Sequence, residues 1–288
     1  MTKAPKKAEK KVETTGHEWD GIQELNNPLP RWWLWTFYGC IVFALGYMVL
    51  YPAWPISKEG ATPGLLHWST RADVAKDIKK FDAANGPLEA KLVATDLTKV
   101  KDDAELYHFA TRDGAAVFRT WCAQCHGAGA AGNKGFPNLL DDDWLWGGDI
   151  ETIYTTVKDG IRSASDDDTR SGEMPAWGDV LEPEELTQVV NYVMSLSGEE
   201  ADATLAQAGA TVFADNCAAC HGDDAKGDRD QGAPNLTDAI WLYGGDKDTI
   251  TQTVTNGRHG VMPNWNTRLS DTDIRAAALY VHQLGGGE

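Results

Sequence analysis

A single long apolar stretch lies near the start of the chain, ahead of a much longer part in which apolar residues recur at helical spacing. The 26 residues between Arg31 and Lys58 carry no formal charge, and they begin WWLWTFYGCIVFALGYMVL. About 20 apolar residues cross the hydrocarbon core of a bilayer as a helix. Tryptophan and tyrosine, which favour the membrane–water interface, gather at both ends of the stretch. We therefore predict one transmembrane helix over residues 32–55.

The residues before this stretch predict its orientation. Residues 1–11 carry five lysines and one glutamate, and the positive-inside rule places such a segment in the cytoplasm. The apolar stretch is too long for a signal peptide, and no small-residue cleavage site follows it. We predict an uncleaved anchor, with residues 1–31 in the cytoplasm and the chain from residue 56 onward on the periplasmic side.

The rest of the chain is predicted to be mainly helical, in two similar sets of helices. Three stretches with apolar residues at helical spacing are followed by three more of the same kind. Only the six residues SGEEAD (197–202) separate the sets. We predict a connecting segment, 56–103, and then two small domains, 104–197 and 202–285. The expected helices are 104–120, 149–159 and 182–196 in the first set, and 203–216, 246–256 and 270–284 in the second.

The two sets also repeat one another residue by residue. The first copy carries nine extra residues before its last matched segment, and we place them in the polar stretch SASDDDTRS (163–171), as a surface loop. The matched segments are FRTWCAQCHG (118–127) with FADNCAACHG (213–222), PNLLDDDWLWGGDIETI (137–153) with PNLTDAIWLYGGDKDTI (234–250), and MPAW (174–177) with MPNW (262–265).

Each copy contains the string C-x-x-C-H, which is the attachment signature of c-type haem. Two thiols add to the porphyrin vinyl groups and the histidine binds the iron. A zinc site would need four ligands closing one tetrahedron, whereas the two pairs lie 95 residues apart. A redox dithiol would be expected in a strand–helix context, which the pattern does not show. We predict two covalently bound haem c groups, on Cys122, Cys125 and His126 and on Cys217, Cys220 and His221.

A Met-Pro pair recurs in register with each haem motif, although methionine is scarce, with five in 288 residues. Haem iron in c-type cytochromes commonly takes one histidine and one methionine. A lone methionine more often fills a gap in a core, but the repetition favours ligation. We predict that His126 and Met174 bind one iron and that His221 and Met262 bind the other. Because both irons would then lack an open position, we assign no catalytic residue.

Further repeated residues are candidates for supporting the haems without binding iron. The carbonyls of Pro137 and Pro234 could accept a hydrogen bond from the ligand histidines and so fix their rings. Trp144 and Trp241 could contact the haem edge or its propionates, with ordinary core packing an equal alternative. Three residues stay open between a haem role and a surface role, namely Arg162, Arg258 and His259.

The charge is strongly acidic after the apolar stretch. Residues 56–288 carry 20 basic and 38 acidic side chains. Most of these charges are expected simply to be solvated, but an acidic surface also attracts basic partners through long-range steering. A basic donor protein is therefore a reasonable partner, and we expect no binding to nucleic acid.

Two further segments carry a resemblance to a known family. EWDGIQELNNPLPRWWLW (18–35) and YPAWP (51–55), together with the two haem motifs and their Met-Pro loops, resemble the CcoP/FixP family of cbb-type cytochrome c oxidase subunits. The resemblance covers about residues 18–284 and leaves the lysine-rich start and the glycine tail unconstrained. It implies a mainly α fold, with one N-terminal transmembrane helix followed by two tandem class I cytochrome c domains.

The same resemblance implies a function. The chain would be a subunit of a proton-translocating haem–copper oxidase of high oxygen affinity in the bacterial inner membrane. It would pass electrons from a donor cytochrome c to a monohaem cytochrome c subunit, and thence to the haem–copper catalytic subunit. Oxygen reduction would belong to that subunit.

Three other functions stay open at this point. A membrane-tethered dihaem carrier serving another respiratory enzyme would need the same haems and anchor. A dihaem peroxidase would need one haem with a vacant or displaceable ligand. A gas sensor would need Met174 or Met262 to give way to a diatomic molecule.

Overall fold

The computed structural model describes residues 12–56 and 60–288. The chain divides into two compact units, Met1–Asp82 and Ala83–Glu288, and each is described by itself. The lysine-rich segment 1–11, on which the predicted orientation rests, lies outside the described residues. Helices predominate in the part that is described, as predicted for a mainly α protein.

The first unit begins with a β-hairpin of β1 (Thr14–Trp19) and β2 (Ile22–Leu25), which pair antiparallel. Its turn is Asp20-Gly21, and both residues have positive φ, at 49° and 82°. Two-residue hairpin turns favour such a pair because their twist matches that of the strands. The hairpin was not expected from the hydrophobic pattern.

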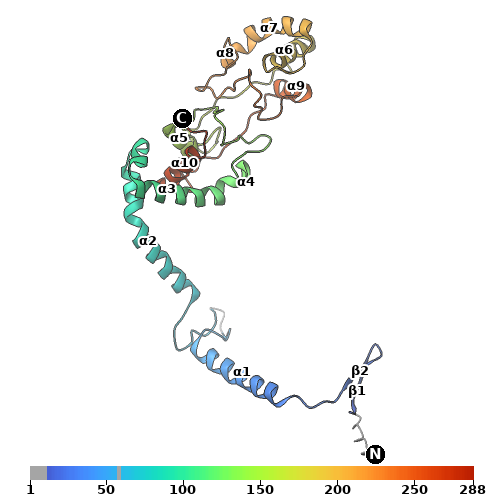
Figure 1. The fold of residues 1–288 in the computed structure, drawn as a ribbon, viewed down its shortest axis with the longest axis vertical. Helices are drawn as coiled ribbons and strands as arrows, with labels where there is room; N and C mark the ends of the chain where they lie inside the picture. The colour runs from blue at the N-terminus through green and yellow to red at the C-terminus, as the bar shows by residue number, and fades with distance from the viewer. Residues whose placement is uncertain (1–11, 57–59) are drawn as a thin grey trace, which may run out of the picture. The chain divides into compact units, whose positions relative to one another are not determined.

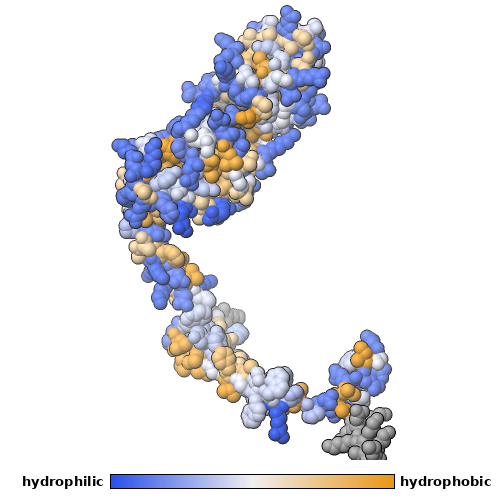
Figure 2. All heavy atoms as spheres, in the orientation of Figure 1, coloured by the Kyte–Doolittle hydropathy of each residue, from blue (hydrophilic) through white to orange (hydrophobic). Residues whose placement is uncertain are grey.

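Helix α1 (Arg31–Leu50) follows and is long and apolar enough to cross a membrane, with a mean hydropathy of 1.7. None of its residues is buried against other parts of the chain, and Figure 2 shows apolar side chains along it. Tyr51 is already extended, so the helix ends before the predicted limit at residue 55. The predicted membrane helix is thus present and slightly shorter.

Helix α2 (Thr70–Ala94) occupies much of the segment that we expected to be a simple connection. The pair Gly86-Pro87 lies inside it, and such residues ordinarily argue against a continuous helix. Its last turns contribute Leu88 and the fully buried Leu92 to a core of the second unit.

The six long helices of the second unit confirm the predicted helices to within a few residues at their ends. Each is preceded by an aspartate, glutamate or serine that caps it, which explains why the pattern located them well. The helices are α3 (Ala104–Val117), α5 (Ile150–Asp159), α6 (Pro183–Leu196), α7 (Ala203–Asn216), α9 (Lys247–Asn256) and α10 (Asp271–His282). Shorter turns are η1 (Leu97–Asp102), η2 (Phe118–Cys122), α4 (Ala123–His126) and α8 (Ala218–His221).

From the sequence we expected the helices of each copy to pack together, but they do not. α3 of the first copy packs against α10 of the second, and α6 packs against α7 (Figure 1). Two separate cores result, one joining α3, α5 and α10 and the other joining α6, α7 and α9. We call the first domain I, formed by residues 83–161 and 262–288, and the second domain II, formed by residues 173–257.

The two helix pairs are built alike. A Cβ atom at Gly114 of α3 would overlap the carbonyl of Ala276 in α10, and one at Gly209 of α7 would overlap the carbonyl of Gln188 in α6. Glycine therefore permits each close crossing. Beside each crossing a phenylalanine meets a tyrosine, with ring centroids 5.4 Å apart for Phe118–Tyr280 and 5.3 Å apart for Tyr192–Phe213.

The short linker explains the exchange of helices. Residues 197–202 connect α6 directly to α7, and consecutive helices joined by a short loop usually pack as an antiparallel hairpin. Once α6 and α7 pair, α3 can pair only with α10. Domain II is consequently one continuous segment, inserted into domain I between α5 and Met262.

The substitution Gly114→Val should destabilise domain I, because the new side chain meets the α10 backbone rather than a movable side chain. Overpacking of this kind costs about 1–3 kcal/mol, and about 1 kcal/mol lowers the unfolding midpoint by roughly 2–4 °C in a unit of this size. Thermal unfolding of the full chain in detergent, followed by circular dichroism, measures the shift.

Gly86→Ala is the matched control, since nothing lies within 4 Å of its Cβ position in α2. It should be neutral or slightly stabilising, because glycine inside a helix costs about 0.5–1 kcal/mol relative to alanine. Equal midpoints for Gly114→Val and the unmodified chain would contradict the observed crossing.

Candidate haem sites

Domain I contains a largely apolar cavity that carries the first haem motif. Cys122 and His126 line it from the first copy, and Met262 lines it from the second. Met174, the expected partner of His126, is not among the lining residues. Most of the remaining wall is hydrocarbon or aromatic, as the faces of a porphyrin require, and includes Phe118, Leu139, Trp146, Ile153, Val157 and Val281.

Backbone hydrogen bonds fix the Met262 loop to the first copy. Ile161 N donates to Met262 O at 2.8 Å, and Met262 N donates to Ile161 O at 3.0 Å. Trp265 N donates to Lys158 O at 3.1 Å, at the end of α5. Gly160 ends α5 with φ at 74°, and a Cβ atom there would lie 2.5 Å from Met262 O. The end of α5 therefore positions the methionine of the other copy.

Domain II holds Met174 in the same manner. Trp177 N donates to Val254 O at 3.0 Å and Gly178 N donates to Thr255 O at 3.0 Å, both in α9. Gly257 ends α9 in the left-handed conformation, with φ at 59°, and a Cβ atom there would overlap Met174 O. Met174 thus joins the core that contains Cys217 and Trp241.

The structure places one methionine beside residues of each haem motif, but it exchanges the two methionines relative to our prediction. We expected His126 with Met174 and His221 with Met262. Instead Met262 shares a cavity with His126, and Met174 packs into the core of the second haem motif. The physical reason is the pairing of α6 with α7, since Met174 lies just before α6 and travels with it.

Both motif histidines are oriented as predicted. His126 Nδ1 lies 3.1 Å from Pro137 O, and His221 Nδ1 lies 3.1 Å from Pro234 O. A carbonyl can only accept, so Nδ1 carries the hydrogen and Nε2 keeps its lone pair for a metal. Burial lowers the pKa of both imidazoles, and the bond to the prolyl carbonyl offsets part of that effect. The rings are therefore neutral at pH 7, as metal ligands must be.

The first cysteine of each motif lies at its predicted site, because Cys122 lines the domain I cavity and Cys217 packs against the core of domain II. Burial raises the pKa of Cys122 and of Cys217 to about 11, and the second cysteine of each motif adds to the effect. Both groups are thus protonated at neutral pH. A thioether forms when such an S–H group adds across a vinyl group, and the donor set therefore fits haem c.

The two tryptophans differ in their hydrogen bonds. Among the described residues, Trp241 Nε1 is buried without a partner, and a buried donor without an acceptor is costly. A haem propionate would supply an acceptor of the right chemistry. Trp144 Nε1 instead donates to Gly286 O at 2.5 Å.

The glycine tail, which we expected to be unconstrained, is therefore held in place. Besides the bond from Trp144 to Gly286, Glu288 N donates to Gly148 O at 3.0 Å. The Glu288 carboxylate accepts two bonds from Arg229 of domain II, at 2.7 and 2.8 Å. The tail thus joins the two haem domains.

Arg170, which was not among the candidates expected from the sequence, is the counterpart of Arg258 in the repeat. Arg170 and Arg258 occupy equivalent places, because their guanidinium carbons lie 5.2 Å from the Trp146 ring centroid and 4.6 Å from that of Tyr243. Each Nε donates to a threonine hydroxyl, at 3.1 and 2.9 Å. The strings RSGEMP and RHGVMP carry this correspondence. It was hidden because we placed the nine extra residues after Arg162 instead of before Arg170.

Arg162 has a different place, at the crossing of the two connections between the domains. Its Nε donates to Gly260 O at 2.6 Å and its Nη1 donates to Gly172 O. Gly172 and Gly260 each lie two residues before a methionine of the haem sites. Burial lowers the pKa of this guanidinium. Arg162 thus fastens the backbone leading to both Met-Pro loops.

The nine extra residues do more than form a surface loop. Ser163 is buried, and its hydroxyl donates to Asn264 Oδ1 at 2.8 Å. Ser165 Oγ donates to the same oxygen at 2.7 Å. His259, by contrast, contacts Gly257 O through Nδ1 at 2.9 Å and does not line the domain I cavity. The insertion therefore packs on the segment after Met262.

Two family models match the chain. One, described as the N-terminal domain of cytochrome oxidase-cbb3, FixP, matches residues 11–58. The other, described as cytochrome C oxidase, cbb3-type, subunit III, matches residues 109–193 and again residues 204–281. The second model thus matches both copies of the repeat.

Curated relatives match over nearly the whole chain. The chain is 63% identical to the cbb3-type cytochrome c oxidase subunit CcoP of Cereibacter sphaeroides, over 96% of this chain and 95% of the relative. It is 59% identical to the subunit of the same name from Rhodobacter capsulatus, over 100% of both. It is 51% identical to the cbb3-type cytochrome c oxidase subunit FixP of Sinorhizobium medicae, over 96% of both.

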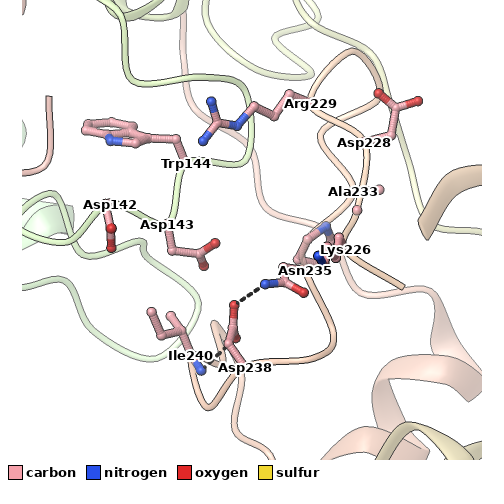
Figure 3. Close-up of a pocket in the computed structure, with 12 residues that line it drawn as sticks. Asp142, Asp143, Trp144, Lys226, Asp228, Arg229, Ala233, Asn235, Asp238 and Ile240 are labelled. Carbon is pink, nitrogen blue, oxygen red and sulfur yellow. Dashed lines mark hydrogen bonds between the residues drawn. The ribbon is translucent and has the colours of Figure 1, made fainter. Parts of the chain in front are cut away.

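A second cavity, of about 440 Å³, lies between the two haem domains. Asp142, Asp143 and Trp144 line it from domain I, while Arg229 and Asp238 are among the residues that line it from domain II (Figure 3). Burial raises the pKa of Asp143 to about 6, with Asp238, Asp141 and Asp142 adding to the effect and Arg229 opposing it. The negative charges gathered here therefore repel one another across the domain boundary.

The Asp143→Asn variant should gain stability over the unmodified chain as the pH rises from about 4 to about 7. Because the folded-state pKa of Asp143 is raised from its ordinary 3.8 to about 6, the folded chain holds this proton more tightly than the unfolded chain. The unmodified chain therefore loses stability as the pH rises between these two values, whereas asparagine has no proton to release. Unfolding midpoints of both proteins across this pH range measure the difference.

At the acid end of the range both side chains are neutral, and the two midpoints should converge. Carboxylates that do not interact with Asp143 are common to the two proteins, so their titration cancels in the comparison. A difference in midpoint that stays constant with pH would contradict the raised pKa.

Proposed function

Because the chain belongs to the CcoP/FixP family of cbb3-type cytochrome c oxidase subunits, we propose that it carries electrons from a donor cytochrome c into such an oxidase. It is a membrane-anchored subunit with two covalently bound haem c groups, and it is not the catalytic subunit of the complex. The oxygen-reducing haem–copper site belongs to a different subunit.

The observation that carries the proposal is the cavity with Cys122, His126 and Met262 on its walls. A haem bound there supplies reversible one-electron chemistry. His126, held by Pro137 O, would hold the iron through Nε2, and Met262 would supply a soft thioether that favours the reduced state. Apolar walls exclude water. Such a site exchanges electrons and leaves no position for a substrate.

The ligand sets follow the packing. We assign His126 and Met262 to the haem on Cys122 and Cys125, and His221 and Met174 to the haem on Cys217 and Cys220. In both sites the histidine would come from one copy of the repeat and the methionine from the other. Trp241 Nε1, buried without a partner among the described residues, would donate to a propionate of the second haem.

The orientation in the membrane follows from charge and chemistry. Residues 1–11 with their five lysines would lie in the cytoplasm, and both haem domains in the periplasm of a bacterial inner membrane. The haem domains belong to a strongly acidic stretch, with 38 acidic against 20 basic residues over 56–288, and Figure 2 shows a largely hydrophilic face. A donor cytochrome with a basic face would be attracted there. The next acceptor would be the monohaem cytochrome c subunit.

The methionine assignments predict that replacing Met262 affects the first haem and that replacing Met174 affects the second. In a chain carrying Cys217→Ala and Cys220→Ala only the first haem remains, and its spectrum reports on one site. There, Met262→Leu should abolish the long-wavelength charge-transfer band of methionine-ligated ferric haem and lower the reduction potential, because the thioether is lost. Met174→Leu should leave both unchanged.

The same test applies to the full dihaem chain, in case the single-haem chain is unstable. Redox titration should show that Met262→Leu lowers one of the two potentials and Met174→Leu lowers the other. Phe118→Leu, in the wall of the first cavity, should move the same potential as Met262→Leu. If Met174→Leu and Phe118→Leu moved the same potential, the exchange of methionines would be wrong.

The proposed function predicts how the chain behaves in the cell. In a strain from which its gene is deleted, the intact chain should restore oxygen uptake by membranes and co-purify with a subunit containing haem b and copper. A chain with Cys217→Ala and Cys220→Ala should not restore uptake, because the second haem cannot be attached.

Cys40→Ala is the matched control. Cys40 is a cysteine of α1, outside both haem motifs, so uptake and co-purification should be retained. Recovery of the intact chain alone from gently solubilised membranes would favour a free dihaem carrier. Restored uptake with the chain lacking its second haem would exclude a path through that haem.

A further inference from the structure

The side chain of Trp146 lies between the two haem sites. It lines the cavity that holds His126 and Met262, and only 9% of it is exposed. The far edge of its indole contacts Gly232 of domain II so closely that a Cβ atom on that glycine would overlap ring atoms Cε2 and Cζ2. One ring thus belongs to the wall of the first site and touches the other domain.

Gly232 is close to the second haem along the chain. It lies two residues before Pro234, whose carbonyl accepts the hydrogen bond from His221 Nδ1 at 3.1 Å. The contact of Trp146 with Gly232 therefore reaches the backbone that holds the proposed iron ligand of the second haem. From the first cavity to His221 the path runs through packed atoms, short covalent segments and one hydrogen bond.

The position of the indole is strongly constrained. The guanidinium of Arg170 lies over the ring, 5.2 Å from its centroid, and is itself bonded to Thr156 Oγ1 at 3.1 Å. The Cβ position of Gly172 lies 3.1 Å from ring atom Cη2. A side chain with so little freedom keeps its contacts constant, as a fixed electron path requires.

The repeat supplies a natural comparison at Tyr243, the equivalent of Trp146. Arg258 lies over its ring at 4.6 Å, and the ring faces Gly135, two residues before Pro137. The contact is looser, because the nearest ring atom lies 3.3 Å from the Cβ position of Gly135. The stronger connection between the domains is therefore on the tryptophan side.

We propose that Trp146 is the principal bridge for electron exchange between the two haem c groups of this chain. One ferrous iron becomes ferric and the other ferric iron becomes ferrous. No bond is made or broken and no proton moves. The indole is the medium for tunnelling and is not itself oxidised. This rests on the proposed function, because it needs two haems that exchange electrons.

Pulse radiolysis of the full chain in detergent tests the bridge. A pulse that delivers at most one electron per chain is followed by relaxation between the haems, observed in their α bands. Trp146→Leu should lower the relaxation rate several-fold, since a gap replaces the far edge of the ring. Trp146→Phe should restore part of the rate, and Tyr243→Leu should lower it much less.

Spectra and redox titrations of the same samples separate a bridge from a merely structural role. Trp146 also lines the first cavity, so Trp146→Leu is expected to shift the first potential as Phe118→Leu does. For a bridge, it leaves the methionine band intact and lowers the relaxation rate far more than Phe118→Leu does. An unchanged relaxation rate would overturn the proposal. So would a rate loss accompanied by a lost methionine band, or equal rate losses in Trp146→Leu and in either Phe118→Leu or Tyr243→Leu. Failure of the proposed function would appear differently, as an unmodified chain without two redox-active haems.

Discussion

The packing of α6 against α7 is the interaction on which the rest of the haem unit depends. Six residues join the two helices, and Gly209 lets them approach until the backbone of α7 meets the backbone of α6. Because Met174 precedes α6 by only nine residues, it is carried into the domain of the second haem motif. The first motif must then be completed by the remaining Met-Pro loop and by α10. Both exchanged haem sites follow from one hairpin.

This arrangement gives the two domains different folding requirements. Domain II is one continuous segment, and its helices meet over short distances along the chain. Domain I needs contacts such as that between Gly114 and Ala276, which are separated in the sequence by all of domain II. Closing a long loop costs conformational entropy before the stabilising contacts can form. We therefore expect domain II to form first and the cavity of the first haem motif to be completed last.

The sequence predicted the parts of the sites better than their assembly. Haem motifs, helix ends and the bonds from His126 and His221 to prolyl carbonyls are local features, and the structure has them where expected. The pairing of helices is not local. Phe118 with Tyr280 and Phe213 with Tyr192 are matched residues of the repeat, so each helix is suited to either partner. The lengths of the linkers decide whether helices pair within a copy or between copies, and the repeated motifs carry no information on those lengths.

The exchange also makes the two haem sites mechanically dependent on each other. Two connections cross between the domains, and Arg162 bonds both of them, at Gly172 and Gly260. A displacement at this crossing reaches the loops of Met174 and Met262 together. In two separate domains each site would respond only to its own surroundings. Here Arg162 is hydrogen-bonded to the backbone ahead of both methionine loops, so a shift of one loop strains the bond that holds the other. This couples the two redox centres mechanically.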